Sequence, residues 1–314
     1  MANRYFMIRI IPKSISKKAF SLIELSVVLI IISALIVAIT KASDLIYDAR
    51  LASAKTLTAN SPIFDISDLI LWLEPTLKNS FGVEETGDNQ TISSWYDSSG
   101  NIPNNKMTAA QNTTANKPLY KKQGVNNLPS LYFDGVNDFL SITNNNYVSI
   151  SGSFTIFTVF KPMQNGSSNI SVGILAKDIA GTTTNTPYEI FYNESTKKPA
   201  TSITFNSSTN IENLSVNSIE ENDSAIITTI FDQNNFSQNF AIYLNGNREN
   251  SSTVINSISL STGSLNIGKT QSSASNNFFK GQIAEIIIYN RALNDQEKED
   301  VEHYLANKWG IEID

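Results

Sequence analysis

Three side chains whose oxygens could be metal ligands lie close together in the segment FDGVND, namely Asp134, Asn137 and Asp138. Their oxygens could bind calcium, a hard cation that prefers carboxylate and carbonyl ligands. The same residue types also build tight turns, because Asp and Asn side chains accept hydrogen bonds from the backbone that follows them. We therefore interpret this segment as a turn and keep calcium as the alternative.

The acidic residues are not paired as a glycosidase requires. A retaining glycosidase holds two carboxyl groups about 5–5.5 Å apart across the scissile bond. Glu189 and Glu285 each stand alone in their runs of strand-forming residues. The densest group, Asp295, Glu297 and Glu299, begins a predicted helix, where acids interact favourably with the helix dipole. The sequence thus predicts no catalytic residue and no enzyme, with a glycosidase as a remote alternative.

The scarcity of histidine and the absence of cysteine exclude several other kinds of site. The chain contains one histidine, His303, and no cysteine. A zinc site, a catalytic thiol, a disulfide and a serine triad therefore all lack the residues they need, and His303 is predicted to lie on a helix surface. The glycine motifs of nucleotide-binding proteins are also missing. We expect no cofactor and no metal, apart from the calcium alternative above.

The charge is unevenly distributed. Residues 1–19 hold five basic residues and no acid, so the net charge of −6 less these five positive charges leaves −11 on the remainder. A basic tail before an acidic body is typical of a membrane-targeting segment. The body offers no basic stripe that could neutralise phosphates, which argues against a nucleic-acid partner.

An apolar run extends from Phe20 to Ile39. Twenty helical residues span about 30 Å, the thickness of the hydrocarbon core of a bilayer. Lys17 and Lys18 precede the run, so the positive-inside rule keeps the N-terminus in the cytoplasm and directs the body outward. A cleaved signal peptide has a shorter apolar region that ends in small residues. The longer run here predicts a helix that stays in the membrane.

Glu24 is an exception within this run, since a carboxylate in lipid needs a partner or a function. The segment KKAFSLIEL, from Lys17 to Leu25, resembles the prepilin signal of type IV pilins and type II secretion pseudopilins. The resemblance implies that a prepilin peptidase cleaves between Ala19 and Phe20 and that Phe20 is then N-methylated. It also implies that Glu24 pairs with the terminal amine of a neighbouring subunit. The family usually has Gly where this chain has Ala19, and Met7 is an alternative start.

Residues 40–59 continue the helical pattern, and Asn60-Ser61-Pro62 ends it because the residue before proline avoids helical angles. One helix of about 38 residues is the result. We therefore predict a leader over residues 1–19, a membrane and stalk helix over 20–62, and one domain over 63–314.

The body is predicted to be mainly β, an antiparallel sandwich, because short runs rich in β-branched and aromatic residues alternate with polar loops. Asp134-Gly135 and Asn245-Gly246 are dipeptides that favour hairpin turns. The predicted strands are Leu131–Phe133, Phe139–Ile142, Phe154–Lys161, Glu189–Tyr192, Thr201–Phe205, Ala225–Asp232, Phe240–Leu244, Leu265–Ile267 and Gln282–Tyr289.

A set of fragments in fixed order resembles the laminin-G-like jelly roll of the concanavalin-A-like lectin/glucanase superfamily, from about Asp65 to the C-terminus. The fragments are LILWLEP, SSWYDSSGN, KPLY, LPSLYFDGVNDFLSI, GSFTIFTVFKP, FAIYLNG, LNIG and FKGQIAEIIIYNRAL. Trp72, Trp95 and Tyr96 could stack on sugars, but the resemblance places both tryptophans among residues that shape the fold.

The resemblance also implies a closing helix. Asn294 and Glu297 form a capping box at its start, and Gly310 provides its end. Its expected buried stripe consists of Val301, Tyr304, Leu305 and Trp309.

Together these features predict a minor pilin or pseudopilin that displays a lectin-like adhesion domain on an envelope filament. Its expected partners are a prepilin peptidase, other pilin subunits, the membrane, and a glycan or surface-protein ligand. We expect it in a bacterial inner membrane with the C-terminal domain outside the cytoplasm, and at the cell surface after assembly. The alternative is an anchored surface protein that binds carbohydrate or protein and never polymerises.

Overall fold

The structure is a computed structural model that describes residues 21–82, 84–100, 107–164, 171–178, 186–205, 209–270 and 277–313. The predicted leader, with the cleavage residues Ala19 and Phe20, lies outside the described residues. The chain divides into two compact units, Met1–Ile46 and Tyr47–Asp314. The second unit therefore includes the last residues of the long N-terminal helix, whereas the sequence placed the start of the body at residue 63.

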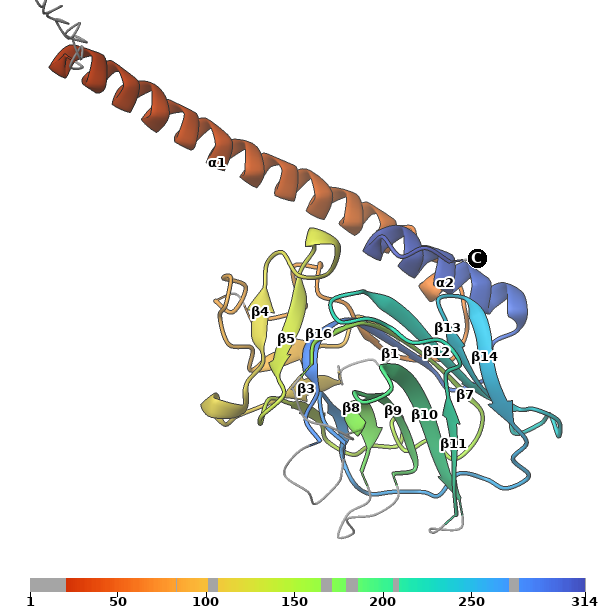
Figure 1. The fold of residues 1–314 in the computed structure, drawn as a ribbon. Coiled ribbons are helices and arrows are strands. Elements are labelled where there is room, and N and C mark those ends of the chain that lie inside the picture. Colours follow the sequence, from red (N-terminus) through yellow and green to blue (C-terminus); the bar gives the residue numbers. More distant parts are fainter. Residues whose placement is uncertain are drawn as a thin grey trace, which may run out of the picture. The chain divides into compact units, whose positions relative to one another are not determined.

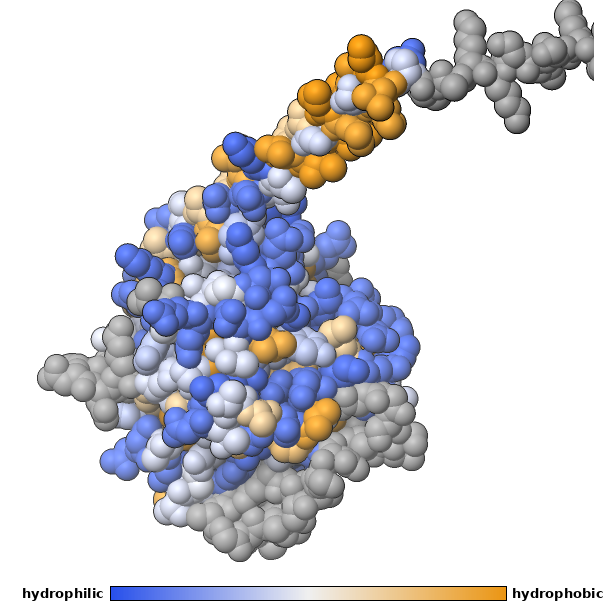
Figure 2. All heavy atoms as spheres, turned by 90° about the vertical axis from the view of Figure 1, so that its left-hand side faces the viewer, coloured by the Kyte–Doolittle hydropathy of each residue, from blue (hydrophilic) through white to orange (hydrophobic). Residues whose placement is uncertain are grey.

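The long helix α1 spans Leu22–Ala59 and contains 38 residues, as predicted (Figure 1). A 3-10 turn, η1 (Pro62–Phe64), follows it, which confirms that the Asn60-Ser61-Pro62 segment ends the helix. The helix is long and apolar enough to cross a membrane, and none of its most apolar window is buried. Figure 2 shows the apolar surface gathered on this helix. By length and composition, it fits a membrane anchor or a signal sequence.

The hydroxyl groups within the apolar helix form hydrogen bonds inside the helix itself. Ser26 Oγ donates to the Ile23 carbonyl at 2.8 Å, and Ser33 Oγ donates to the Leu29 carbonyl at 2.7 Å. In lipid no water can satisfy a hydroxyl, so these bonds reduce the cost of burying serine in a bilayer.

The second unit contains two antiparallel sheets of eight strands each, counted over the described residues. Sheet A has the order β14 (Asn247–Ser252), β13 (Phe240–Leu244), β12 (Ala225–Phe231), β7 (Phe154–Pro162), β16 (Lys280–Tyr289), β5 (Ser130–Asp134), β4 (Leu119–Lys121), and β1 (Leu69–Leu73) also pairs with β16. Sheet B has the order β11 (Thr209–Leu214), β10 (Lys198–Phe205), β9 (Tyr188–Asn193), β8 (Ser171–Lys177), β15 (Leu265–Ile267), β6 (Leu140–Ile142), β3 (Thr108–Ala110), β2 (Ser94–Tyr96). Short 3-10 turns, η2 (Thr114–Asn116) and η3 (Val125–Asn127), lie between strands.

Two apolar clusters stabilise the unit. The larger one fills the space between the sheets, with inward side chains such as Trp95, Phe160 and Leu265. The smaller one lies on the outer face of sheet A, where Phe157 and Ile287 pack against the C-terminal helix α2 (Asp295–Trp309) and against Ala54 of α1. The layers are therefore helices, sheet A and sheet B, so the outer face of sheet B is on the side opposite α2 (Figure 1). The predicted fold class, a mainly β antiparallel sandwich with an N-terminal and a C-terminal helix, is confirmed.

Helix α2 has the predicted ends. Asn294 Oδ1 accepts the Glu297 N–H at 3.0 Å, while Glu297 accepts the Asn294 N–H at 3.0 Å, which completes the capping box. Gly310 adopts a left-handed φ of 63° at the C-terminus, as glycine does readily. The predicted apolar stripe, namely Val301, Tyr304, Leu305 and Trp309, is buried.

The two predicted hairpin turns have different outcomes. Asn245 and Gly246, with φ values of 49° and 85°, join the paired strands β13 and β14, so this turn is confirmed. The hairpin prediction for Asp134-Gly135 is wrong, because β5 belongs to sheet A and β6 to sheet B. The turn chemistry is present there, but it serves a crossover between sheets.

Candidate ligand-binding face

One row of residues crosses sheet B in register. Ser141 lies opposite Asn266, Asn266 opposite Ala176, and Ala176 opposite Glu189. Ser202 then lies between Glu189 and Glu212. Residues opposite each other in a sheet point to the same face, and their chain neighbours Ile142, Leu265, Ile190 and Ile203 belong to the central core. The row therefore lies on the outer face of sheet B. We call its polar members, Ser141, Asn266, Glu189, Ser202 and Glu212, the polar row.

Hydroxyl groups orient the carboxylate of Glu189. Its Oε1 accepts a hydrogen bond from Ser202 Oγ at 2.8 Å, and its Oε2 accepts one from Thr270 Oγ1 at 2.7 Å. Burial, followed by the negative charge of Glu189, raises the pKa of Glu212. The two acids thus lie on either side of the buried Ser202: Glu189 is partly buried and hydrogen-bonded through both oxygens, whereas Glu212 is exposed.

The other end of the polar row is an amide network. Ser141 Oγ donates to Asn266 Oδ1 at 2.5 Å, and Asn266 Nδ2 donates to the carboxylate of Asp178. Burial raises the pKa of Asp178, while the Asn266 hydrogen bond and the charge of Lys269 oppose this change.

Two partly exposed phenylalanine rings lie beside this network. The Lys269 Nζ atom lies 3.7 Å from the ring centroid of Phe139, which is paired with Phe278 at 6.3 Å. Ring faces next to fixed hydrogen-bond donors and acceptors are what a sugar requires, since a sugar presents both C–H faces and hydroxyl groups. This region can therefore bind a ligand that has several hydroxyl groups.

The FDGVND segment forms hydrogen bonds of the kind expected for a turn. Asp134 Oδ1 accepts the N–H groups of Val136, Asn137 and Asp138 at 2.8, 3.2 and 3.3 Å. Asp138 Oδ2 accepts the Asp134 N–H at 3.0 Å. The turn interpretation is confirmed by these bonds, while calcium stays a prediction, with Asn137 Oδ1, buried without a hydrogen-bond partner, as a further oxygen.

The raised pKa of Asp138 predicts that the stability of the sandwich depends on pH. Burial, followed by the charge of Asp134, raises the pKa of Asp138 to about 7. A raised carboxyl pKa means that the stabilising contribution is complete below about pH 4 and is lost as the pH rises through about 7. We expect Asp138→Asn to remove this dependence and to stabilise the fold at pH 8 by about 1–2 kcal/mol.

Tryptophan fluorescence during urea unfolding at pH 5 and pH 8 measures this effect, because all three tryptophans are buried in the second unit. A wild-type protein that is equally stable at both pH values would contradict the prediction. If calcium binds, adding it at pH 8 stabilises the wild type and leaves Asp138→Asn unchanged.

The aromatic candidates are mainly core residues. Trp72 and Trp95 are fully buried, which confirms the core interpretation, and Tyr96 is partly exposed. Trp95 stacks on Phe81 with ring centroids 5.9 Å apart. Neither tryptophan can therefore contact a sugar.

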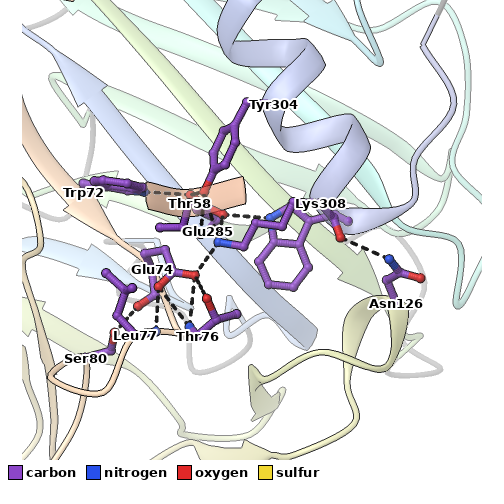
Figure 3. Close-up of polar contacts among 11 residues, drawn as sticks. Thr58, Trp72, Glu74, Thr76, Leu77, Ser80, Asn126, Glu285, Tyr304 and Lys308 are labelled. Atoms are coloured by element: carbon purple, nitrogen blue, oxygen red, sulfur yellow. Dashed lines mark hydrogen bonds and ion pairs between the residues drawn. The ribbon is translucent and has the colours of Figure 1, made fainter. Parts of the chain in front are cut away.

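Glu285 has charged neighbours that the sequence did not reveal. Lys308 Nζ contacts the carboxylates of both Glu74 and Glu285, the latter at 2.9 Å, and all three side chains are fully buried (Figure 3). Trp72, Trp309 and Tyr304 also donate to Glu285, at 2.7, 2.8 and 2.9 Å. Burial raises the pKa of Glu285, and the charge of Lys308 opposes this change. We call Glu74, Glu285 and Lys308 the buried charge cluster; no substrate can reach its carboxylates.

The remaining candidate residues on α2 lie at its N-terminus or on its exposed surface. Glu297 forms an ion pair with Arg291 at 2.6 Å, and this hydrogen-bonded pairing lowers the pKa of Glu297. Asp295 lies in the first turn of the helix, and Glu299 and His303 are exposed. Within the part of the chain that the structure describes, no group of three or more acidic or histidine residues could hold a metal ion.

Glu24 has a bonding partner within its own chain. The Ser21 N–H donates to Glu24 Oε2 at 2.8 Å, and the Glu24 N–H donates to Ser21 Oγ at 3.2 Å. This reciprocal pair is a capping box at the start of α1, and the spacing Ser-x-x-Glu could have revealed it.

A family model of the concanavalin A-like lectin/glucanases superfamily matches residues 134–297. This match covers more than half of the 314 residues. The chain belongs to this superfamily. The matched region includes all five residues of the polar row. No curated protein sequence matches the chain.

Solved structures share the fold at low identity. The binding domain of Paraclostridial mosquitocidal protein 1 has 16% identity and a TM-score of 0.55, covering 79% of this chain and 56% of that one. The binding domain of botulinum neurotoxin serotype G has 15% identity and a TM-score of 0.53, covering 76% and 51%. The Trypanosoma rangeli sialidase has 12% identity and a TM-score of 0.50, covering 77% and 33%. This chain thus spans about half or less of these relatives, and the likeness shows the fold.

Proposed function

We propose that this protein is a membrane-anchored binding protein whose sandwich binds a glycan outside the cytoplasm and catalyses no reaction. The observation that carries the proposal is the polar row on the outer face of sheet B. Because α2 and the end of α1 pack on sheet A, the row lies on the face of the second unit opposite α2. The binding domains of two toxins have the same fold, which supports a binding role.

Orientation in the membrane follows from sequence. Lys17 and Lys18 precede the apolar run, so the proposed N-terminus is cytoplasmic and the sandwich is outside. A glycan on another cell or in the surrounding medium is then accessible to the polar row.

A glycan array tests this function. The full chain in a detergent without a sugar headgroup is applied at high protein concentration, with calcium present. We expect hits on a restricted set of glycans. An array without hits would contradict glycan binding and favour the alternative that the row binds a surface protein.

We also infer that the protein is a minor pilin or pseudopilin in an envelope filament, in a bacterial inner membrane before assembly. Support comes from the segment Lys17–Leu25 and from the acid at Glu24. Cleavage between Ala19 and Phe20 by a prepilin peptidase and N-methylation of Phe20 belong to this proposal. Intact mass of the protein from cells with and without the peptidase tests it, and an unprocessed N-terminus in peptidase-positive cells would contradict it.

Substitutions at Glu24 separate capping from assembly. Glu24→Gln keeps an oxygen that can accept the Ser21 N–H but removes the charge, whereas Glu24→Val removes both. If the charge pairs with the amine of a neighbouring subunit, both variants insert into the membrane and neither enters filaments.

Blots of membrane and sheared-filament fractions measure the two steps. A Glu24→Gln variant that enters filaments as the wild type does would show that capping is the role of Glu24. Wild-type protein that stays in the membrane fraction and is absent from sheared filaments would instead favour the alternative of an anchored protein that never polymerises.

A further inference from the structure

A pocket of about 250 Å³ lies between the end of α1, the η3 turn and the end of α2. Arg50, Ser53, Ala54 and Leu57 form one face of α1, because they follow the i, i+3, i+4, i+7 spacing. The other lining residues are Asn126, Leu128, Asn307 and Lys308. All eight belong to the unit Tyr47–Asp314. A volume of this size suits a small ligand.

The charge in this pocket comes from Arg50. The ammonium group of Lys308 is directed away to Glu74 and Glu285, as Figure 3 shows, so it is neutralised. The Arg50 guanidinium has no ion pair among the described residues, and none of the eight lining residues is acidic. Arg50 is exposed, so the pocket is an open cationic site that has no anion from the described part of the chain.

The pocket is lined by both polar and apolar side chains. The exposed Ser53 and Asn307 provide a hydroxyl and an amide that are able to donate hydrogen bonds, and Ala54 and Leu128 are buried apolar residues. Asn126 is held in place by its Nδ2 atom, which donates to the Lys308 carbonyl at 3.1 Å. Gly310 leaves room for this side chain, since a Cβ at residue 310 would lie 2.9 Å from Asn126.

We propose that this pocket binds a small monocarboxylic acid with a short aliphatic chain. A guanidinium binds a carboxylate through two parallel hydrogen bonds, and Ala54 and Leu128 would contact the aliphatic chain. Phosphate sites commonly use several successive backbone N–H groups, and this pocket offers a single guanidinium instead. It therefore suits a carboxylate better than a phosphate. Because the lining has no acid, an α-amino group on the ligand finds no partner, so a simple acid binds better than an amino acid. The bound acid contacts both α1 and α2.

Isothermal titration of the full chain in an uncharged detergent tests the proposal, with pentanoate, norvaline and pentanamide as probes. We expect pentanoate to bind with a Kd of about 1 mM and the other two at least tenfold more weakly. Arg50→Gln should weaken pentanoate binding at least tenfold. Lys55→Gln removes an exposed positive charge from the same helix and should leave the Kd within about twofold.

Two results would overturn the proposal. Equal affinity for pentanoate in wild type and Arg50→Gln would mean that Arg50 does not hold the carboxylate. If pentanoate does not bind the wild type, the proposal is wrong. A lower oligomeric state of Arg50→Gln in sedimentation experiments would then show that the pocket instead receives an acidic side chain of a second copy of the chain.

Discussion

Lys308→Met is expected to destabilise the sandwich by about 3–5 kcal/mol. The substitution removes the cation from the buried charge cluster and leaves Glu74 and Glu285 fully buried without a counter-charge. The methionine fills a similar volume, so loss of the charge and not a cavity causes the change. Urea unfolding followed by tryptophan fluorescence measures the free energy of unfolding.

Two further variants define the cause. Lys55→Met, at an exposed position of α1, should change stability by less than about 0.5 kcal/mol. Adding Glu74→Gln to Lys308→Met removes one uncompensated charge and should restore part of the loss. A cost below about 1 kcal/mol for Lys308→Met would show that the cluster is not held as an ion pair.

A shortened chain that begins at Tyr47 should fold with the stability of the intact sandwich, whereas one that begins at Ile63 should lose about 4 kcal/mol or more. Tyr47, Ala54 and Thr58 are buried in the second unit. Lys122 Nζ lies 4.3 Å from the ring centroid of Tyr47, and the Thr58 hydroxyl lies 3.3 Å from the Tyr304 hydroxyl.

Unfolding midpoints of the two shortened chains measure this difference. Equal midpoints would mean that the end of α1 is a passive stalk, as the boundary predicted from the sequence implies. The triple change Tyr47→Ala, Ala54→Ser and Thr58→Ala in the longer version should reproduce most of the loss, which separates lost packing from the effect of a new terminus.

The helices could be predicted because their ends depend on neighbouring residues. Pro62 ends α1, and Asn294, Glu297 and Gly310 delimit α2 in the sequence as in the structure. Nine apolar runs also became strands. The strands missed by this approach include β11 and β14, whose sequences TNIENL and NRENSS lack apolar alternation because they lie at sheet edges.

The candidate site could not be predicted, because it depends on register. The five residues of the polar row lie on five different strands, spread along the chain from Ser141 to Asn266. Only the pairing of sheet B brings these residues into line. Lys308 and Glu74 are 234 residues apart, so no local pattern links them. The wrong hairpin at Asp134-Gly135 has a related cause, because turn residues do not specify which sheet the next strand joins.

The affinity of the polar row for a glycan tests the central claim most directly. A glycan identified on the array is titrated into the wild type, into the double variant Glu189→Gln/Ser202→Ala, and into Glu299→Gln, which removes an exposed acid on α2. We predict that the double variant binds at least tenfold more weakly, because the partly buried hydroxyl–carboxylate pair that orients Glu189 is lost. We predict that Glu299→Gln binds as the wild type does. Equal affinities in all three proteins would contradict the assignment of the binding face to sheet B.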